Sequence, residues 1–136
     1  MIKYRTGNDL DLDEVIDLYK ASTLGLRRPI DDQKRFRAML KKANLVLTAW
    51  DGKLLVGISR SLTDFSYITY LSDLAVRASH QKLGIGKELI RRTQVHGGAK
   101  TTLLLLSAPA AITYYPHIGF THASQAWLLR PGEEVH

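Results

Sequence analysis

The sequence predicts a mixed α/β fold in which helices flank a mostly antiparallel sheet that contains one parallel pair of strands. Two observations support this. Segments with apolar residues at helical spacing alternate with short runs typical of strands. Two of those runs are joined by Asp51-Gly52, a strong signal for a tight hairpin. With 136 residues, the chain is expected to be a single domain, residues 1–136, with one core.

Two amphipathic helices are expected in the first third of the chain, after a strand over Ile2 to Arg5. Asp11 and Glu14 resemble a capping box that opens the first helix, and a second helix should begin after Pro29, at Asp31 or Asp32. Both helices carry apolar residues spaced i, i+3, i+4, i+7: Leu12, Val15, Ile16 and Tyr19 in the first, and Phe36, Met39, Leu40 and Ala43 in the second.

The remaining elements follow from apolar runs and from glycine and proline positions. A helix should run to about His96 and stop at Gly97-Gly98. The expected strands are Leu45 to Trp50, Leu54 to Leu62, Tyr67 to Val76, a buried strand over Thr102 to Ser107, and a closing strand around Trp127 to Arg130. The parallel pair is expected where Leu71 to Val76 meets Leu103 to Ser107.

Gly84-Ile85-Gly86 stands between an apolar strand and a helix, an order typical of a phosphate-binding turn. Glycines at the mouth of a helix let the backbone approach an anion, and the N–H groups of the first turn point at it. The helix dipole favours negative charge there, and Lys82 and Lys87 add positive charge. A simple turn or packing role for these glycines is the alternative.

Two well-known nucleotide motifs do not fit this turn. A dinucleotide fingerprint needs a third glycine where this chain has Leu89. A P-loop needs glycine where this chain has Gln81, and a hydroxyl where Glu88 follows Lys87. Neither nucleotide motif therefore fits the turn.

The stretch Leu74 to Ile90, LAVRASHQKLGIGKELI, resembles the acetyl-CoA signature, Gln/Arg-x-x-Gly-x-Gly/Ala, of the GNAT superfamily of N-acetyltransferases. The stretch Ala111 to Phe120, AITYYPHIGF, is similar to that family's downstream motif, in which an aromatic pair precedes Gly-Phe. Both motifs stand in the family's order and spacing, with one apolar strand between them. The resemblance covers nearly the whole chain.

The resemblance implies an N-acetyltransferase that moves an acetyl group from acetyl-CoA to a primary amine by direct attack in a ternary complex. In that family the two parallel strands splay apart and the pantetheine arm lies between them. Matched by position, the residues expected at the cofactor are Leu74, Ala75, Val76, Gln81, Lys82, Leu83, Gly84, Ile85, Gly86, Lys87 and Tyr115. The side chains of Leu83 and Ile85 are expected to face protein.

The family motif places Tyr115 as the general acid that protonates the departing thiolate of coenzyme A. Without the resemblance, a buried aromatic with a satisfied hydroxyl would be the favoured interpretation. Tyr114 is the natural control, because a shift of one position would exchange the two tyrosines. Pro116 departs from the charged residue more usual there, and it should end the helix early.

Asp73 is the candidate general base, since it lies one residue before the stretch expected to contact the cofactor. An equally strong alternative is a carboxylate that holds neighbouring basic or backbone groups, and a water relay could replace a dedicated base. Strand alternation puts Asp73 on one face with Leu71 and Ala75, unless a bulge reverses this.

The acceptor should meet the loop Thr23 to Ile30, the start of the second helix and the tail after Phe120. Arg27 and Arg28 could bind a carboxylate, whereas Asp31, Asp32 and Asp64 could attract an amine. The small size of the chain favours a small-molecule amine, only weakly over a protein amine. A homodimer through an exposed final strand is possible.

Composition narrows the remaining classes. The chain has no cysteine, five histidines away from metal-ligand spacing and a polar start, so we expect a cytoplasmic protein with no metal and no membrane contact. A net charge of +6 leaves a nucleic-acid-binding module as an alternative, although the basic pairs are scattered. A second alternative is an inactive acyl-CoA sensor.

Overall fold

A computed structural model describes all residues from 1 to 136. The chain divides into two compact units, Met1–Leu106 and Ser107–His136, and each is described by itself. The first unit contains the whole sheet and the three longest helices. No helix is long and apolar enough to cross a membrane.

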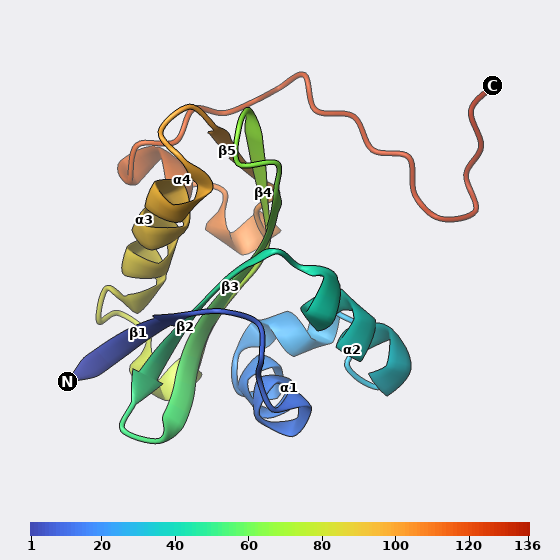
Figure 1. The fold of residues 1–136 in the computed structure, drawn as a ribbon. Coiled ribbons are helices and arrows are strands. Elements are labelled where there is room, and N and C mark those ends of the chain that lie inside the picture. Colours follow the sequence, from blue (N-terminus) through green and yellow to red (C-terminus); the bar gives the residue numbers. More distant parts are fainter. The chain divides into compact units, whose positions relative to one another are not determined.

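The first unit is built on one sheet with the strand order β1-β2-β3-β4-β5 (Figure 1). Neighbouring strands are antiparallel except β4 and β5, which are parallel. The strands are β1 (Ile2–Thr6), β2 (Leu45–Asp51), β3 (Leu54–Thr63), β4 (Ile68–Val76) and β5 (Thr102–Leu105). This confirms the predicted fold class.

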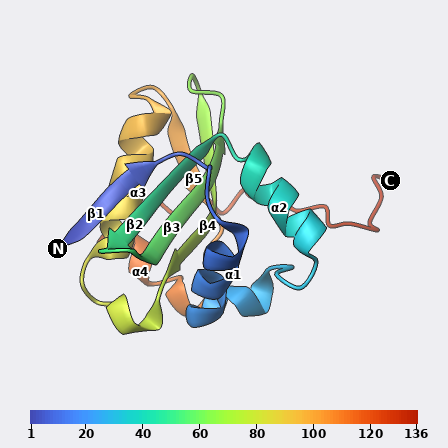
Figure 2. The ribbon, with the colours of Figure 1, turned by 60° about the horizontal axis from the view of Figure 1, so that its bottom comes forward.

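Helices cover both faces of the sheet (Figures 1 and 2). α1 (Leu12–Ala21) and α2 (Gln33–Lys42) lie on one face, and α3 (Ile85–Gly97) lies on the other. The predicted apolar stripe of α1 is buried, as is that of α2 apart from the half-buried Met39. Two separate apolar clusters thus hold the helices to the sheet.

The starts of α1 and α2 differ in how they are capped. Asp32 caps α2 by accepting a hydrogen bond from the Arg35 N–H at 3.2 Å, so the predicted start at Asp32 is confirmed. Asp11 occupies the N-cap of α1, but its side chain accepts no capping hydrogen bond. The expected capping box with Glu14 is therefore not formed.

β4 carries one more residue than β3 at Ser72. Asp73 is paired with Arg60 and Leu71 is paired with Ser61, so Ser72 has no opposite residue. This arrangement is a β-bulge, which breaks the regular alternation of side chains along a strand.

The bulge moves side chains of β4 from one face of the sheet to the other. Thr69 adjoins Gly97 of α3, and regular alternation places Leu71 on that same face. Beyond the bulge, Asp73 contacts Tyr19 of α1 on the opposite face. Simple alternation, which put Asp73 beside Leu71, is wrong here, and the alternative of a bulge is confirmed.

The parallel pair is shorter than expected and lies earlier in β4. Its register runs from Ile68↔Thr102 to Leu71↔Leu105, so residues 72–76 have no partner on the β5 side. The expected pairing of Leu71 to Val76 is wrong apart from Leu71. β5 is also an edge strand with alternating exposure rather than a strand buried on both faces.

The second unit contains a 3-10 turn, Pro109–Ala111, and the short helix α4 (Tyr114–His117). Pro116 lies inside α4 instead of ending it, because N–H groups in a first helical turn have no intrahelical acceptor to lose. The expected strand around Trp127 to Arg130 is absent, and Trp127 is 92% exposed.

Trp50 is the opposite case within the first unit. Only 8% of it is exposed, and its indole N–H donates to the Thr48 hydroxyl at 2.8 Å. The Arg5 guanidinium lies 4.6 Å from its ring centroid. Trp50 is therefore a packing residue of the sheet.

Candidate functional site

The connection from β4 to α3 forms a tight, polar turn. After a 3-10 turn over Ala78–His80, the Gln81 side chain donates to the Val76 carbonyl at 3.1 Å. Gly84 then caps α3 in the left-handed conformation at φ 81°. The first intrahelical bond joins the Glu88 N–H to the Gly84 carbonyl at 3.0 Å.

This geometry leaves backbone donors at the start of α3 for a ligand. The N–H groups of the first turn, which belong to Gly84, Ile85, Gly86 and Lys87, precede the first intrahelical donor. Together with the positive end of the helix dipole they favour an anion. The geometry of the turn thus suits an anion, and its role in binding phosphate stays a prediction.

Gly84 and Gly86 differ in what a side chain at each position would disturb. Gly84 has a backbone conformation that side chains disfavour. A Cβ on Gly86 would meet only the Val76 and Leu74 side chains, at 3.7 and 3.9 Å, which is ordinary contact. The packing of the protein therefore does not demand glycine at Gly86, whereas close approach of a ligand would.

Charge at the turn is positive. Lys82 and Lys87 are exposed, and Glu88 is paired with both Arg91 (2.6 Å) and Arg92 (3.0 Å). The hydrogen bond from Arg91 and the neighbouring arginine lower the pKa of Glu88 to about 2. The single acid of this turn is thus neutralised by two cations.

The predicted cofactor residues differ in exposure. Ile85 is buried at 2% exposure, as expected, but Leu83 is 66% exposed, so the expectation that its side chain faces protein is wrong. Leu74 and Val76 pack on the α3 side of β4, and Ala75 is buried on the α1 side. All three follow the end of β4–β5 pairing.

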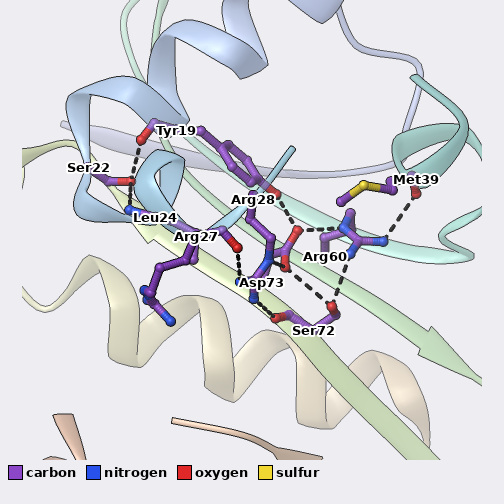
Figure 3. A network of polar contacts seen from close by, with 9 residues as sticks. All are labelled: Tyr19, Ser22, Leu24, Arg27, Arg28, Met39, Arg60, Ser72 and Asp73. Carbon is purple, nitrogen blue, oxygen red and sulfur yellow. Dashed lines mark hydrogen bonds and ion pairs between the residues drawn. The ribbon is translucent and has the colours of Figure 1, made fainter. Parts of the chain in front are cut away.

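Asp73 lies at the centre of a buried polar network (Figure 3). Its Oδ1 accepts from Arg28 Nε at 2.6 Å and from the Ser72 hydroxyl at 3.3 Å. Its Oδ2 accepts from Arg60 Nε at 2.7 Å and from the Tyr19 hydroxyl at 2.7 Å. We call these five residues the Asp73 clamp.

The clamp fixes the protonation of its members. Burial alone would raise the pKa of Asp73, but Arg60, Tyr19 and Arg28 outweigh it and lower this pKa below its ordinary value. Burial and the negative charge of Asp73 raise the pKa of Tyr19 well above 10. Asp73 is therefore a carboxylate, and Tyr19 a neutral donor, across the ordinary pH range.

The arginines of the clamp also bind backbone carbonyls. Arg60 donates to Met39 of α2 at 3.2 Å, and Arg28 donates to Ser72 at 2.8 Å and to Arg27 at 2.9 Å. Arg28 is thus engaged within the protein, so of the two arginines expected to bind a substrate carboxylate, Arg27 is the exposed one.

Sequence reasoning named Asp73 but missed the groups that bind it: Tyr19, Arg28 and Arg60. The sequence predicts Tyr19 as part of an apolar helical stripe and Arg28 as a candidate for binding a substrate carboxylate. The sequence contains one signal of a buried polar network: Arg60 is the one charged residue in the otherwise uncharged stretch Leu54–Thr63. A cation in such a strand requires a buried partner.

Tyr115 belongs to the second unit. Its ring lies edge-on to Tyr114 and to Phe120, each at a centroid distance of 5.4 Å. The Phe120 N–H donates to the Tyr115 carbonyl at 3.0 Å, which closes the turn after α4. The role of Tyr115 toward coenzyme A stays a prediction.

A family model described as the acetyltransferase (GNAT) domain matches residues 21–127. The match includes the clamp residues from Arg28 onward, the glycine turn and α4. The chain belongs to the GNAT acetyltransferase family.

Individual relatives agree with this assignment. An uncharacterized N-acetyltransferase, ycf52, of Pyropia yezoensis is 25% identical over 116 residues, which are 77% of this chain and 65% of that protein. A GNAT family protein from Streptococcus pneumoniae is 23% identical with a TM-score of 0.69, covering 96% of this chain and 99% of that one.

Further solved structures share the fold. A putative acetyltransferase from Deinococcus radiodurans has a TM-score of 0.76 at 21% identity, over 95% of this chain and 88% of that one. The aminoglycoside N-acetyltransferase AAC(6')-Iy, solved in complex with CoA, has a TM-score of 0.73 at 18% identity, over 96% and 94%. At these identities the likeness shows the fold.

Proposed function

We propose that residues 1–136 form one GNAT domain that transfers an acetyl group from acetyl-CoA to a primary amine of a small molecule. One observation carries the proposal: the left-handed Gly84 opens α3 directly after the stretch of β4 that has lost its β5 partner. The glycine turn therefore adjoins the part of β4 that has no β5 partner. Membership of the family supports the acyl transfer itself.

The residues present fit an acyl-CoA. The backbone of Leu74, Ala75 and Val76 would bind the pantetheine arm, and the turn from Gln81 to Lys87 would hold the pyrophosphate. When bound, acetyl-CoA supplies an acetyl thioester, whose carbonyl is the electrophile. Lys82 and Lys87 would raise the local concentration of this anion.

Proton transfers are assigned to Tyr115 and to water. The phenol of Tyr115 would protonate the thiolate that leaves, since a phenol donates well in a partly apolar site. The amine must lose a proton, and we assign its removal to a water relay and not to Asp73. The Asp73 carboxylate already accepts four hydrogen bonds.

The acceptor is proposed to be a compact amine that meets the segment Thr23–Ile30. Leu26 is 90% exposed and Arg27 is exposed on this segment, so both an apolar and a charged side chain face solvent. Aminoglycoside N-acetyltransferases share the fold, which makes polyamino compounds a reasonable first panel. We place the reaction in the cytoplasm, where acetyl-CoA and a reducing environment suit a chain without cysteine.

The experiment that tests the cofactor is thermal unfolding with and without acetyl-CoA, with NADH and ATP as controls. Ligand at about 100 times its dissociation constant should add roughly 2.7 kcal/mol of stability. Gly86→Glu should keep the fold, because an acid in a first helical turn is favourable, yet its charge should repel the pyrophosphate. Gly86→Gln adds similar bulk without the charge, so the difference between the two variants measures the effect of the charge alone.

The outcomes separate three classes of protein. A shift specific to acetyl-CoA that Gly86→Glu abolishes, followed by thiol release with an amine, supports the transferase. A specific shift without turnover on any amine supports a sensor. An equal shift with every polyanion would overturn the proposal and favour a nucleic-acid-binding module.

A further inference from the structure

The Asp73 clamp joins segments far apart in the sequence. Tyr19 comes from α1, Arg28 from the segment after it, Arg60 from β3, and Ser72 and Asp73 from β4 (Figure 3). Three of the donors to Asp73 thus come from three separate segments of the chain, and the fourth donor, Ser72, is its neighbour in sequence. Removing one donor should therefore loosen the segment that carries it.

The carboxylate of Asp73 has no capacity left for a proton. An ionised carboxylate offers about four lone-pair sites. Four donors fill them: Arg28 Nε, the Ser72 hydroxyl, Arg60 Nε and the Tyr19 hydroxyl. The Asp73 side chain is also fully buried, with 0% exposed. A group that takes a proton from an amine, directly or through water, needs a free lone pair and access.

The clamp is located where the pairing of β4 with β5 ends. Arg28 donates to the carbonyl of Ser72, the first residue of β4 beyond the last pair with β5, Leu71↔Leu105. The same hydrogen bond fixes the bulge, because Ser72 is its extra residue. Arg28 therefore attaches the segment Thr23–Ile30 to β4 just beyond its last pair with β5.

The two faces of β4 beyond its last pair with β5 carry different parts of the site. Leu74 and Val76 face α3 and its glycine turn, whereas Asp73 faces α1. A cofactor held at the turn and an acceptor that arrives from the α1 side would meet at residues 72–76 of β4. The segment that Arg28 attaches thus borders the acceptor side.

We propose that Asp73 is a positioning residue for the acceptor amine, acting through Arg28 to hold the segment Thr23–Ile30 against residues 72–76 of β4, beyond the last pair with β5. It is not the group that accepts the proton of the amine. The inference rests on the proposed transferase function, which supplies the acceptor. It assigns to one salt bridge, Arg28 Nε to Asp73 Oδ1 at 2.6 Å, the task of shaping the acceptor site.

The test compares Arg28→Ala, Arg28→Lys, Asp73→Asn and the double variant Arg28→Ala/Asp73→Asn. Arg27→Ala is the matched control for segment order, because the Arg27 side chain lies outside the clamp. Backbone hydrogen exchange over residues 23–30 is measured with acetyl-CoA bound, with β2 and β3 as internal references. Steady-state kinetics use the amine that turns over best in the panel.

Arg28→Ala should speed exchange over residues 23–30, but not in β2 and β3, and Arg27→Ala should leave it unchanged. Acceptor KM should rise roughly 10- to 100-fold, as loss of positioning predicts, with kcat within about threefold and acetyl-CoA affinity retained. Arg28→Lys should recover part of the loss. The double variant should be no worse than the worse single one, because both remove the same interaction.

Two results would overturn the inference. One is unchanged exchange and unchanged acceptor KM in Arg28→Ala, which needs no Asp73 variant and so survives a failure of Asp73→Asn to fold. The other is a kcat loss of about 100-fold or more in Asp73→Asn that Arg28→Ala does not share, as expected for a general base. Absence of turnover in the unsubstituted chain would instead overturn the proposed function, and the acceptor role with it, whatever the exchange shows.

Discussion

Gly57 of β3 lies directly against Leu89 of α3: a Cβ built on Gly57 would stand 3.0 Å from Leu89 Cδ1 and 3.1 Å from Ile85 Cγ2. Side chains rarely approach so closely, so glycine at this position sets how near α3 lies to the sheet. The start of α3 carries the glycine turn. Glycine at position 57 of β3 thus lets the first turns of α3, which follow the glycine turn, lie close to the sheet.

Gly57→Val should destabilise the protein by about 1–3 kcal/mol, the usual cost of overpacking a core. It should also weaken acetyl-CoA binding, because the first turn of α3 is displaced. Urea unfolding and a binding titration measure the two effects. Adding Leu89→Ala should relieve part of the destabilisation, and a fully additive double variant would show that the contact with Leu89 is unimportant.

Gly84→Ala should cost about 1–2 kcal/mol, because a side chain at φ 81° is strained. Gly84→Asn should cost less, since asparagine tolerates the left-handed conformation. Gly86→Ala is the opposite case and should be neutral or stabilising, because a helix favours alanine over glycine and the space exists. Equal losses at both positions in urea unfolding would contradict the difference between the two glycines.

Acid should destabilise the first unit through Asp73. The pKa of Asp73 is lowered in the folded protein, so its contribution is complete above its ordinary value of 3.8 and is lost as the pH falls below that value. Glu88 acts in the same direction between its ordinary 4.5 and about 2. In a Glu88→Gln background, unfolding free energy from urea titrations should therefore still fall below pH 4, and a flat profile would contradict the clamp.

Tyr115→Phe should lower kcat by about 100-fold or more while acetyl-CoA affinity changes little, because the variant removes only the hydroxyl. Tyr114→Phe is the matched control and should retain most activity. Stopped assays of thiol release measure both. If the Tyr114 variant lost activity instead, the two tyrosines would have to exchange roles.

The positions of helices and strands in the first unit could be predicted because local patterns determine them. The stripe from Leu12 to Tyr19, the Asp51-Gly52 turn and the Gly97-Gly98 stop all concern residues a few positions apart. The bulge at Ser72 and the short β4–β5 register arise from pairing between distant segments. Such registers depend on tertiary contacts that one sequence does not display.

The candidate site follows the same division. The glycine turn is contiguous, so its residues could be named and its geometry anticipated. The clamp joins Tyr19 to Asp73 across 54 positions, and only the isolated Arg60 hinted that a buried charge needed partners. Contiguous features of a site were thus predictable, and features assembled by folding were not.

The two tryptophans provide separate optical reporters. Trp50 is enclosed in the sheet at 8% exposure, whereas Trp127 is 92% exposed in the second unit. Acrylamide should therefore quench the emission of Trp127 readily and that of Trp50 only after unfolding. With Trp127→Phe, the remaining fluorescence follows the unfolding of the first unit alone; with Trp50→Phe, the exposed Trp127 gives the quenching of a solvent-exposed indole in the same chain as the reference.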